Sequence, residues 1–274
     1  MGSQMAKKLK VSVPPTVNGV QQVELASWRE FHPFVNEALP GPQDYIFRGQ
    51  RVSTWPLESS LDRALREMRK QGTAAPLARH HLAEFHLAIR GRRGVNPKEL
   101  REQEEEHELW ALGQHHGLWT PLLDWTESPF VALYFAFEKP HPMQKGTRAV
   151  FALSLHLVQS MSNNIEQKQR PGSPARADVL QIIRPMTDEN ARLVSQGGLF
   201  TRGTFGVDIE RWVRKYFRGV GSAALVKIVV PEDKGDRFEV LRALNRMNIN
   251  HRSLFPDLLG SAEFCNMRLS VAGY

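Results

Sequence analysis

The apolar segment PFVALYFAF, residues 129–137, most constrains the fold because it directly follows a stretch crowded with polar side chains. It is far too short to span a bilayer, so a protein core must bury it. Residues 113–128 read GQHHGLWTPLLDWTES. Thr126 or Ser128 can cap a helix there, and Pro129 suits its first turn. The pattern predicts a buried helix that packs beneath a polar wall, and that wall lines a pocket.

Strand and helix patterns follow one another along the chain without regular alternation, which predicts an α+β fold with no internal repeat. We expect a loop at 158–177, where Asn, Gln, Ser, Pro and Arg dominate, and Pro121 favours an edge position for its strand. The expected helices are 24–38, 57–112 with a loop near 91–97, 127–138 and 236–249; the expected strands are 45–49, 118–125, 148–156, 179–185 and 224–231.

A chain of 274 residues is long enough for one large core. We expect a flexible basic arm at 1–22, whose first four residues resemble an expression remnant, followed by a single domain at 23–274. No secretory pattern is visible near the start, and Cys265 is the single cysteine. These features predict a cytoplasmic protein without a membrane partner or a disulfide.

The charge of the chain, +7 at pH 7, favours a polyanionic partner such as RNA or DNA, although a basic surface also serves solubility. The segment RWVRKYFR, residues 211–218, interleaves arginines with aromatic residues. That mixture suits phosphate binding with base stacking. It equally suits an amphipathic helix whose aromatic side chains are buried.

Several common catalytic motifs are missing from the sequence. It contains neither G-x-S-x-G nor G-x-x-x-x-G-K-[ST], which gives no support to a serine hydrolase elbow or a P-loop. The histidines at 80, 81, 86, 107, 115 and 116 lack the spacing of two ligands on one helix face, so no metal is expected.

Arg48 directly follows the apolar residues of the strand at 45–49. A buried cation without a partner costs several kcal/mol, so Arg48 requires either a carboxylate such as Asp124 or a ligand phosphate. Asp124 itself precedes a helix and either caps it or serves in a site. His115 and His116 at a helix end either bind terminal carbonyls or supply one side chain to the site.

Five blocks of sequence together resemble the FRG domain family. These blocks are YIFRGQ, WPLESSLDR, ALGQHHGLWTPLLDWTESPFVALYFA, SQGGLF and INHRSLFPDLLGSAEF. They occur in family order over about residues 45–264. One departure is Pro121, which stands where the family usually has a basic residue and weakens any phosphate role for that position.

The order of these blocks is also similar, more distantly, to the ADP-ribosyltransferase superfamily. That resemblance implies a mixed or antiparallel sheet core of that type, with a helical insertion between the first two motif strands. Arg48 and Gly49 match the first motif. Trp125, Thr126 and Ser128 match the second, and Gln196 lies at the third.

The resemblance implies that the protein uses NAD as a substrate. Arg48 would hold phosphate or ribose oxygens as a fork donor, and Gly49 would let the backbone approach closely. The implied catalytic set is Arg48, Asp124 and Gln196. The implied NAD-binding residues are Arg48, Gly49, Gln114, His115, Trp125, Thr126, Ser128 and Tyr134, with Trp125 or Tyr134 stacking on a ring. The late-strand motif has no glutamate, so Asp124, Glu127 or Glu210 would supply the acid.

The leading expectation is a toxin or anti-phage defence effector that transfers ADP-ribose from NAD to nucleic acid, with a protein target as an alternative. Another alternative is a non-enzymatic module that binds nucleotides or nucleic acid. A third is an interaction domain whose motifs only form core and helix caps. A toxic enzyme also requires restraint, which predicts an inhibitory antitoxin-like protein that orders the loop at 158–177 or the N-terminal arm.

Overall fold

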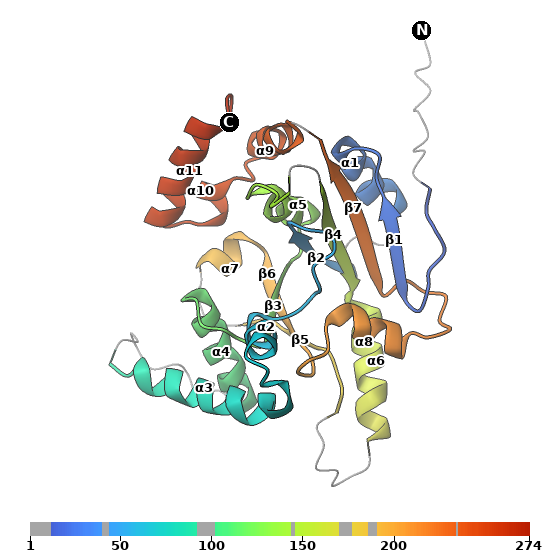
Figure 1. The fold of residues 1–274 in the computed structure, drawn as a ribbon, viewed down its shortest axis with the longest axis vertical. Coiled ribbons are helices and arrows are strands. Elements are labelled where there is room, and N and C mark those ends of the chain that lie inside the picture. The colour runs from blue at the N-terminus through green and yellow to red at the C-terminus, as the bar shows by residue number, and fades with distance from the viewer. Residues whose placement is uncertain are drawn as a thin grey trace.

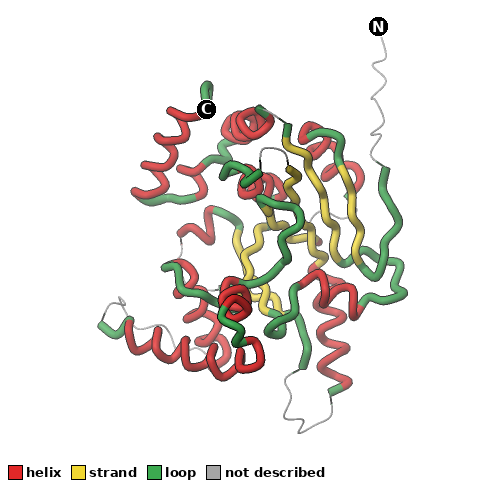
Figure 2. Tube along the Cα trace, viewed as in Figure 1, coloured by secondary structure: helices red, strands yellow, loops and turns green. Residues whose placement is uncertain are grey.

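A single open sheet organises the protein. The computed structural model describes residues 12–39, 44–91, 102–143, 146–169, 177–185, 191–233 and 235–274. Within these ranges seven strands form one sheet in the order β1-β7-β4-β2-β3-β6-β5, with helices around it (Figures 1 and 2). The expected α+β class is confirmed. No helix in the described ranges combines the length and the apolar character that crossing a membrane requires.

The sheet is mixed because one pairing differs from the rest. β1 runs parallel to β7, and the other neighbouring strands are antiparallel. The strands are β1 Val20–Glu24, β2 Tyr45–Gln50, β3 Leu122–Thr126, β4 Gly146–Ser154, β5 Gln181–Ile183, β6 Gly198–Arg202 and β7 Leu225–Glu232.

Helices cover both faces of the sheet and its β3–β6 end. A large core forms under α5, α9, α10 and α11, and a second core forms under α6 and α8. α2, α3 and α4 pack against β3 and β6 and build a third core (Figure 1). The helices are α1 Phe31–Pro33, α2 Ser60–Glu67, α3 Ala74–Ala88, α4 Glu102–His115, α5 Pro129–Phe137, α6 Leu155–Lys168, α7 Ala191–Ser195, α8 Ile209–Tyr216, α9 Asp236–Arg246, α10 His251–Leu254 and α11 Leu258–Ser270.

The pairing between β2 and β3 is the weakest point in the middle of the sheet. These strands meet in one residue pair, Phe47 with Thr126, whereas β2 and β4 pair over six residues. The sheet therefore opens beyond Phe47 and Thr126. Arg48 and Asp124 both lie at this opening, because each is one or two residues from that single pair.

Helix α5 forms where the apolar segment predicted it. The Ser128 hydroxyl accepts a hydrogen bond from the Val131 amide at 3.3 Å, and Pro129 occupies the first turn. Ser128 is thus the cap, while the Thr126 hydroxyl donates to the Gln196 carbonyl at 2.6 Å. The helix lies directly against Gly49, where a Cβ atom would overlap the Ala132 carbonyl oxygen.

Two expectations about local structure are wrong. Most of the expected loop at 158–177 belongs to helix α6, whose cap is the Ser154 hydroxyl and which buries Val158 and Ser162; residues 170–176 lie outside the described residues. β3 lies between β2 and β6 instead of at an edge. Pro121 precedes the strand, where its missing N–H removes no hydrogen bond of the ladder.

Two basic segments, the expected arm at 1–22 and RWVRKYFR at 211–218, contribute to the folded structure. Residues 20–22, which were expected in the arm, form part of β1. Residues 1–11 of the arm lie outside the described residues. Residues 92–97 of the expected loop near 91–97 also lie outside them. RWVRKYFR forms most of α8, and Trp212 is 1% exposed with its indole N–H on the Asp178 carbonyl. Trp212 and Phe217 are buried and Tyr216 is half-buried, which agrees with the alternative of an amphipathic helix that packs its aromatic residues against the protein.

Candidate functional site

The opening between β2 and β3 leads into a pocket of about 400 Å³, a volume typical of small-molecule sites. Residues from β2, β3, β6, α4, α5, α7 and the segments after α7 and α10 line it. They are Phe47, Arg48, Gly49, Gln114, His115, Asp124, Trp125, Thr126, Phe135, Arg192, Leu193, Gln196, Phe200 and Phe255.

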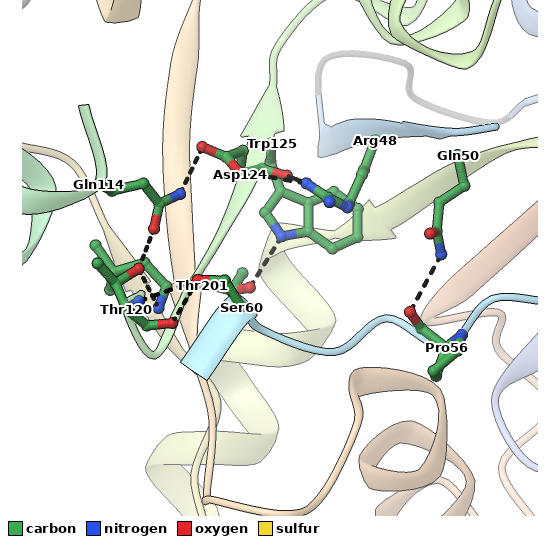
Figure 3. Close-up of polar contacts among 10 residues, drawn as sticks. Arg48, Gln50, Pro56, Ser60, Gln114, Thr120, Asp124, Trp125 and Thr201 are labelled. Atoms are coloured by element: carbon green, nitrogen blue, oxygen red, sulfur yellow. Dashed lines mark hydrogen bonds and ion pairs between the residues drawn. The ribbon is translucent and has the colours of Figure 1, made fainter. Parts of the chain in front are cut away.

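Arg48 and Asp124 face each other across the opening (Figure 3). Arg48 Nη1 donates to the Asp124 main-chain oxygen at 2.7 Å and lies 3.6 Å from Asp124 Oδ2. The Arg48 side chain is 24% exposed, while that of Asp124 is 62% exposed. Burial lowers the pKa of Arg48 and Asp124 opposes that shift, so the guanidinium stays charged.

The Arg48 guanidinium keeps hydrogen-bonding capacity that the protein does not use. Its Nε–H is buried and has no acceptor among the described residues. A buried donor without a partner costs about 1–3 kcal/mol, and an incoming acceptor that lets the side chain adjust would recover part of this. This residue therefore combines a fixed charge with an incompletely used fork, which suits a phosphate or ribose oxygen.

A short chain of hydrogen bonds orients the Asp124 carboxylate. Gln114 Nε2, near the end of α4, donates to Asp124 Oδ1 at 2.7 Å, and the Thr120 hydroxyl donates to Gln114 Oε1 (Figure 3). The Thr120 amide in turn donates to the Ser60 hydroxyl at 3.0 Å. Gln114 holds one oxygen of the carboxylate, and the side chain remains exposed in the pocket lining, where it can contact a ligand.

Another part of the pocket lining combines a second arginine with aromatic rings. Arg192 Nε donates to Asp257 Oδ2 at 2.6 Å, and its guanidinium lies 5.4 Å from the centre of the Phe255 ring. Phe255 meets Phe135 edge to face at 6.1 Å. The Gly260 amide and Arg192 lower the pKa of Asp257, so this pair is ionised at neutral pH. An aromatic and cationic wall thus lines the same pocket as the carboxylate of Asp124.

The structure brings most of the predicted site residues together. Those that line the pocket are Arg48, Gly49, Gln114, His115, Asp124, Trp125, Thr126 and Gln196. Trp125 is only 3% exposed and its indole N–H donates to the Thr201 hydroxyl at 2.9 Å, so its ring is a core side chain with little surface for stacking. Gln196 donates its side-chain amide to the Leu254 carbonyl at 3.1 Å.

Two predicted binding residues and two predicted acids lie elsewhere. Ser128 caps α5, and Tyr134 is fully buried with its hydroxyl 3.1 Å from His251 Nδ1. Burial raises the pKa of Tyr134, so this hydroxyl stays protonated and serves the core. Glu127 pairs with Arg184 at 2.6 Å, and Glu210 pairs with Arg214 on α8. Among the described lining residues, Asp124 is therefore the carboxylate that reaches the pocket.

Six lining residues were not among the predicted site residues: Phe47, Phe135, Arg192, Leu193, Phe200 and Phe255. Phe47, Phe135, Phe200 and Phe255 all occur in the blocks that resemble the FRG family, so the sequence carried a signal for them. Arg192 lies outside those blocks, and its role depends on a contact with Asp257, 65 residues away.

Comparison with known proteins identifies a family whose model matches part of the chain. Residues 43–145 match the family model of the FRG domain, which supports the resemblance over the stretch from β2 to α5. That stretch supplies Arg48, Gly49, Gln114 and Asp124. No curated protein and no solved structure matches the chain. In the described part of the chain, no three His, Cys, Asp or Glu side chains gather as a metal site requires.

Proposed function

We propose that the protein is an NAD-dependent ADP-ribosyltransferase that modifies nucleic acid and acts as a toxin or defence effector. The observation that carries this proposal is the Arg48–Asp124 arrangement: a mostly buried arginine and an exposed carboxylate lie 3.6 Å apart at the opening of the sheet. The order of the motifs along the chain supports an ADP-ribosyltransferase type of core around that opening.

The chemistry requires a cationic side chain that binds the phosphate or ribose oxygens and a carboxylate that lines the same pocket. The bond between ribose and nicotinamide breaks with its electron pair on nicotinamide, and positive charge develops on the ribose as in glycoside hydrolysis. Arg48 binds the pyrophosphate or ribose oxygens. The Asp124 carboxylate stabilises the developing charge or accepts the proton of the attacking nucleophile, so the new bond to the acceptor forms without leaving a charged product.

The aromatic wall supplies the remaining requirement, a surface for flat rings. Phe255 and Phe135 are half-buried side chains of the pocket, and Phe255 already stacks on His251 at 4.2 Å. A nicotinamide or adenine ring placed on them gains burial and offset aromatic contact. Gly49 contributes by letting α5 lie close to β2, which fixes the position of Phe135 relative to Arg48.

One observation favours a second function, a nucleotide-binding module without transferase activity. Gln196 occupies the position of the third motif, where the resemblance implies an acid, and its side-chain amide is engaged with the Leu254 carbonyl. A pocket that binds NAD through Arg48 but lacks an effective acid would have this composition. NAD binding and NAD turnover therefore have to be measured separately.

Substitution of Arg48 by Lys tests the proposed use of NAD. Lysine keeps the charge but loses the fork, so we expect a folded protein that NAD stabilises much less than it stabilises the wild type. The measurement is the thermal unfolding midpoint of each protein with and without saturating NAD. A ligand at 100 times its Kd stabilises by about 2.7 kcal/mol, and a tenfold weaker Kd removes about half of that.

Arg66→Lys is the matched control, because Arg66, on α2, donates to both carboxylate oxygens of Glu58 and does not line the pocket. NAD should stabilise this variant as it does the wild type. Equal stabilisation of wild type and Arg48→Lys would remove Arg48 from the site. No stabilisation of the wild type at high NAD would remove the basis for an NAD-using enzyme.

A further inference from the structure

A second hollow of about 480 Å³ lies between the segment after β1 and helix α9, away from the β2–β3 pocket. Its lining residues are Trp28, Arg29, Glu239, Arg242, Ala243, Arg246 and Gly273, none of which lines the first pocket. Three arginines against one glutamate leave an excess of two positive charges. In Figure 1 α9 lies near the C-terminal end of the chain, next to the helices that follow it.

The excess charge resides on Arg242 and Arg246. Arg29 forms an ion pair with Glu239, which neutralises both. Arg242 Nη1 donates to the Ala272 carbonyl at 2.9 Å, which satisfies one N–H donor but does not neutralise the positive charge of the guanidinium. Arg246 is exposed and forms no hydrogen bond or ion pair in the described part of the chain. Two arginines four residues apart on one helix face repel each other, and a bound anion would relieve that repulsion.

Aromatic side chains accompany these arginines. Phe238 precedes Arg242 by four residues on α9, so it lies on the same helix face; it is 40% exposed, with Arg237 5.6 Å from its ring centre. Across the hollow, the Trp28 indole N–H is buried and lacks an acceptor among the described residues. An exposed ring one helical turn from an arginine whose charge is not neutralised is typical of surfaces that stack bases and bind the backbone of single strands.

The other basic segment does not offer such a surface. On α8, Arg211, Arg214 and Lys215 pair with Asp208, Glu210 and Asp178 at 3.1, 2.7 and 2.6 Å. Its Trp212 and Phe217 are buried. The arginine and aromatic side chains that remain available to a polyanion in the described structure therefore include those of α9.

We propose that the α9 hollow binds the phosphodiester backbone of a single-stranded nucleic acid, with Arg242 and Arg246 on phosphates. Phe238, which lies beside the hollow on the same helix face and is not part of its lining, would lie beneath a base. The site rests on the proposed function only in that the bound strand would be the acceptor of ADP-ribose. An acidic protein would also use the arginines, but it gains nothing comparable from an exposed phenyl ring. The aromatic residue therefore distinguishes the two partners.

Fluorescence anisotropy with labelled single-stranded RNA and DNA of roughly 12 nucleotides tests the site. Arg246→Glu should weaken binding at least about tenfold at moderate salt and should lower the salt dependence of the association constant by about 0.7 per lost phosphate contact. Phe238→Ala should weaken binding about fivefold or more without changing that salt dependence, because stacking releases no counterions. Preference for RNA over DNA would identify recognition of the 2′-hydroxyl.

Arg218→Glu is the matched control, because Arg218 follows α8, is exposed and has no ion pair in the described structure. This substitution changes the net charge by the same amount as Arg246→Glu. Circular dichroism confirms that each variant is folded. Equal loss of binding in Arg218→Glu and Arg246→Glu would overturn the site. The site would also be overturned if Phe238→Ala left binding intact and polyglutamate competed fully with the labelled strand. If NAD fails to stabilise the wild type but strand binding still requires Arg246, the proposed function falls and this site stands.

Discussion

Asp124→Asn is expected to lower the transfer of ADP-ribose about 100-fold or more while leaving NAD binding nearly unchanged. The amide keeps the size of the side chain and can still bind Gln114, but it can neither balance positive charge on the ribose nor accept a proton. The measurement is single-turnover transfer from labelled NAD to RNA, DNA and protein pools, together with nicotinamide release. Thermal stabilisation by NAD provides the separate measure of binding.

Glu127→Gln is the matched control for this variant. Glu127 lies three residues from Asp124 but pairs with Arg184 and does not line the pocket, so its neutralisation should leave turnover unchanged. Full transfer by Asp124→Asn would exclude Asp124 as the acid. A wild type that NAD stabilises but that never releases nicotinamide would instead establish the nucleotide-binding alternative.

Local sequence patterns predicted the elements whose stability is local. The apolar segment, Ser128 and Pro129 specify α5, and the capping hydroxyl and buried face are where the pattern requires them. The strand at Tyr45–Gln50 is similarly clear because its apolar residues are continuous. Arg48 and Asp124 drew attention for a physical reason: a charge that follows a buried strand must find a partner.

Other elements depend on partners distant in sequence. β1 has a largely polar pattern and exists because Val20–Glu24 pair with Leu225–Val229. α6 contains two asparagines and several polar residues that favour loops, yet it buries Val158 and Ser162 against the sheet. Sequence periodicity cannot report either contact, since both depend on tertiary packing that overrides local propensity.

The pocket residues also divide into those that local sequence predicted and those that depend on contacts distant in sequence. Asp124 and Gln114 come from one stretch of sequence, so their proximity was predictable. Arg192 reaches the pocket only because Asp257 holds it and Phe255 lies beneath it. Tyr134 and Trp125 were expected to stack on a ligand, but both are buried in the core, and the half-buried Phe255 and Phe135 face the pocket instead. Aromatic type alone does not reveal which side of a strand or helix meets a cavity.

The close contact between β2 and α5 predicts the second large effect, a severe loss of stability in Gly49→Ala. A Cβ atom at this position would overlap the Ala132 carbonyl oxygen and lie 2.6 Å from the Ala136 amide nitrogen. Both are backbone atoms of a helix, so no side-chain rotation can relieve the overlap. Forcing atoms into a packed core costs about 1–3 kcal/mol and occasionally more, and we expect roughly 3 kcal/mol or more here.

Urea unfolding followed by circular dichroism measures this effect, with Gly72→Ala as the control. A Cβ atom at Gly72 meets nothing within 4 Å, so alanine there should change the free energy of unfolding by less than about 1 kcal/mol. Equal unfolding midpoints for Gly49→Ala and the wild type would show that α5 can move away from β2. Because α5 carries Phe135 and β2 carries Arg48, such movement would also separate the ring wall from the arginine, and the pocket could not be the rigid site that NAD transfer requires.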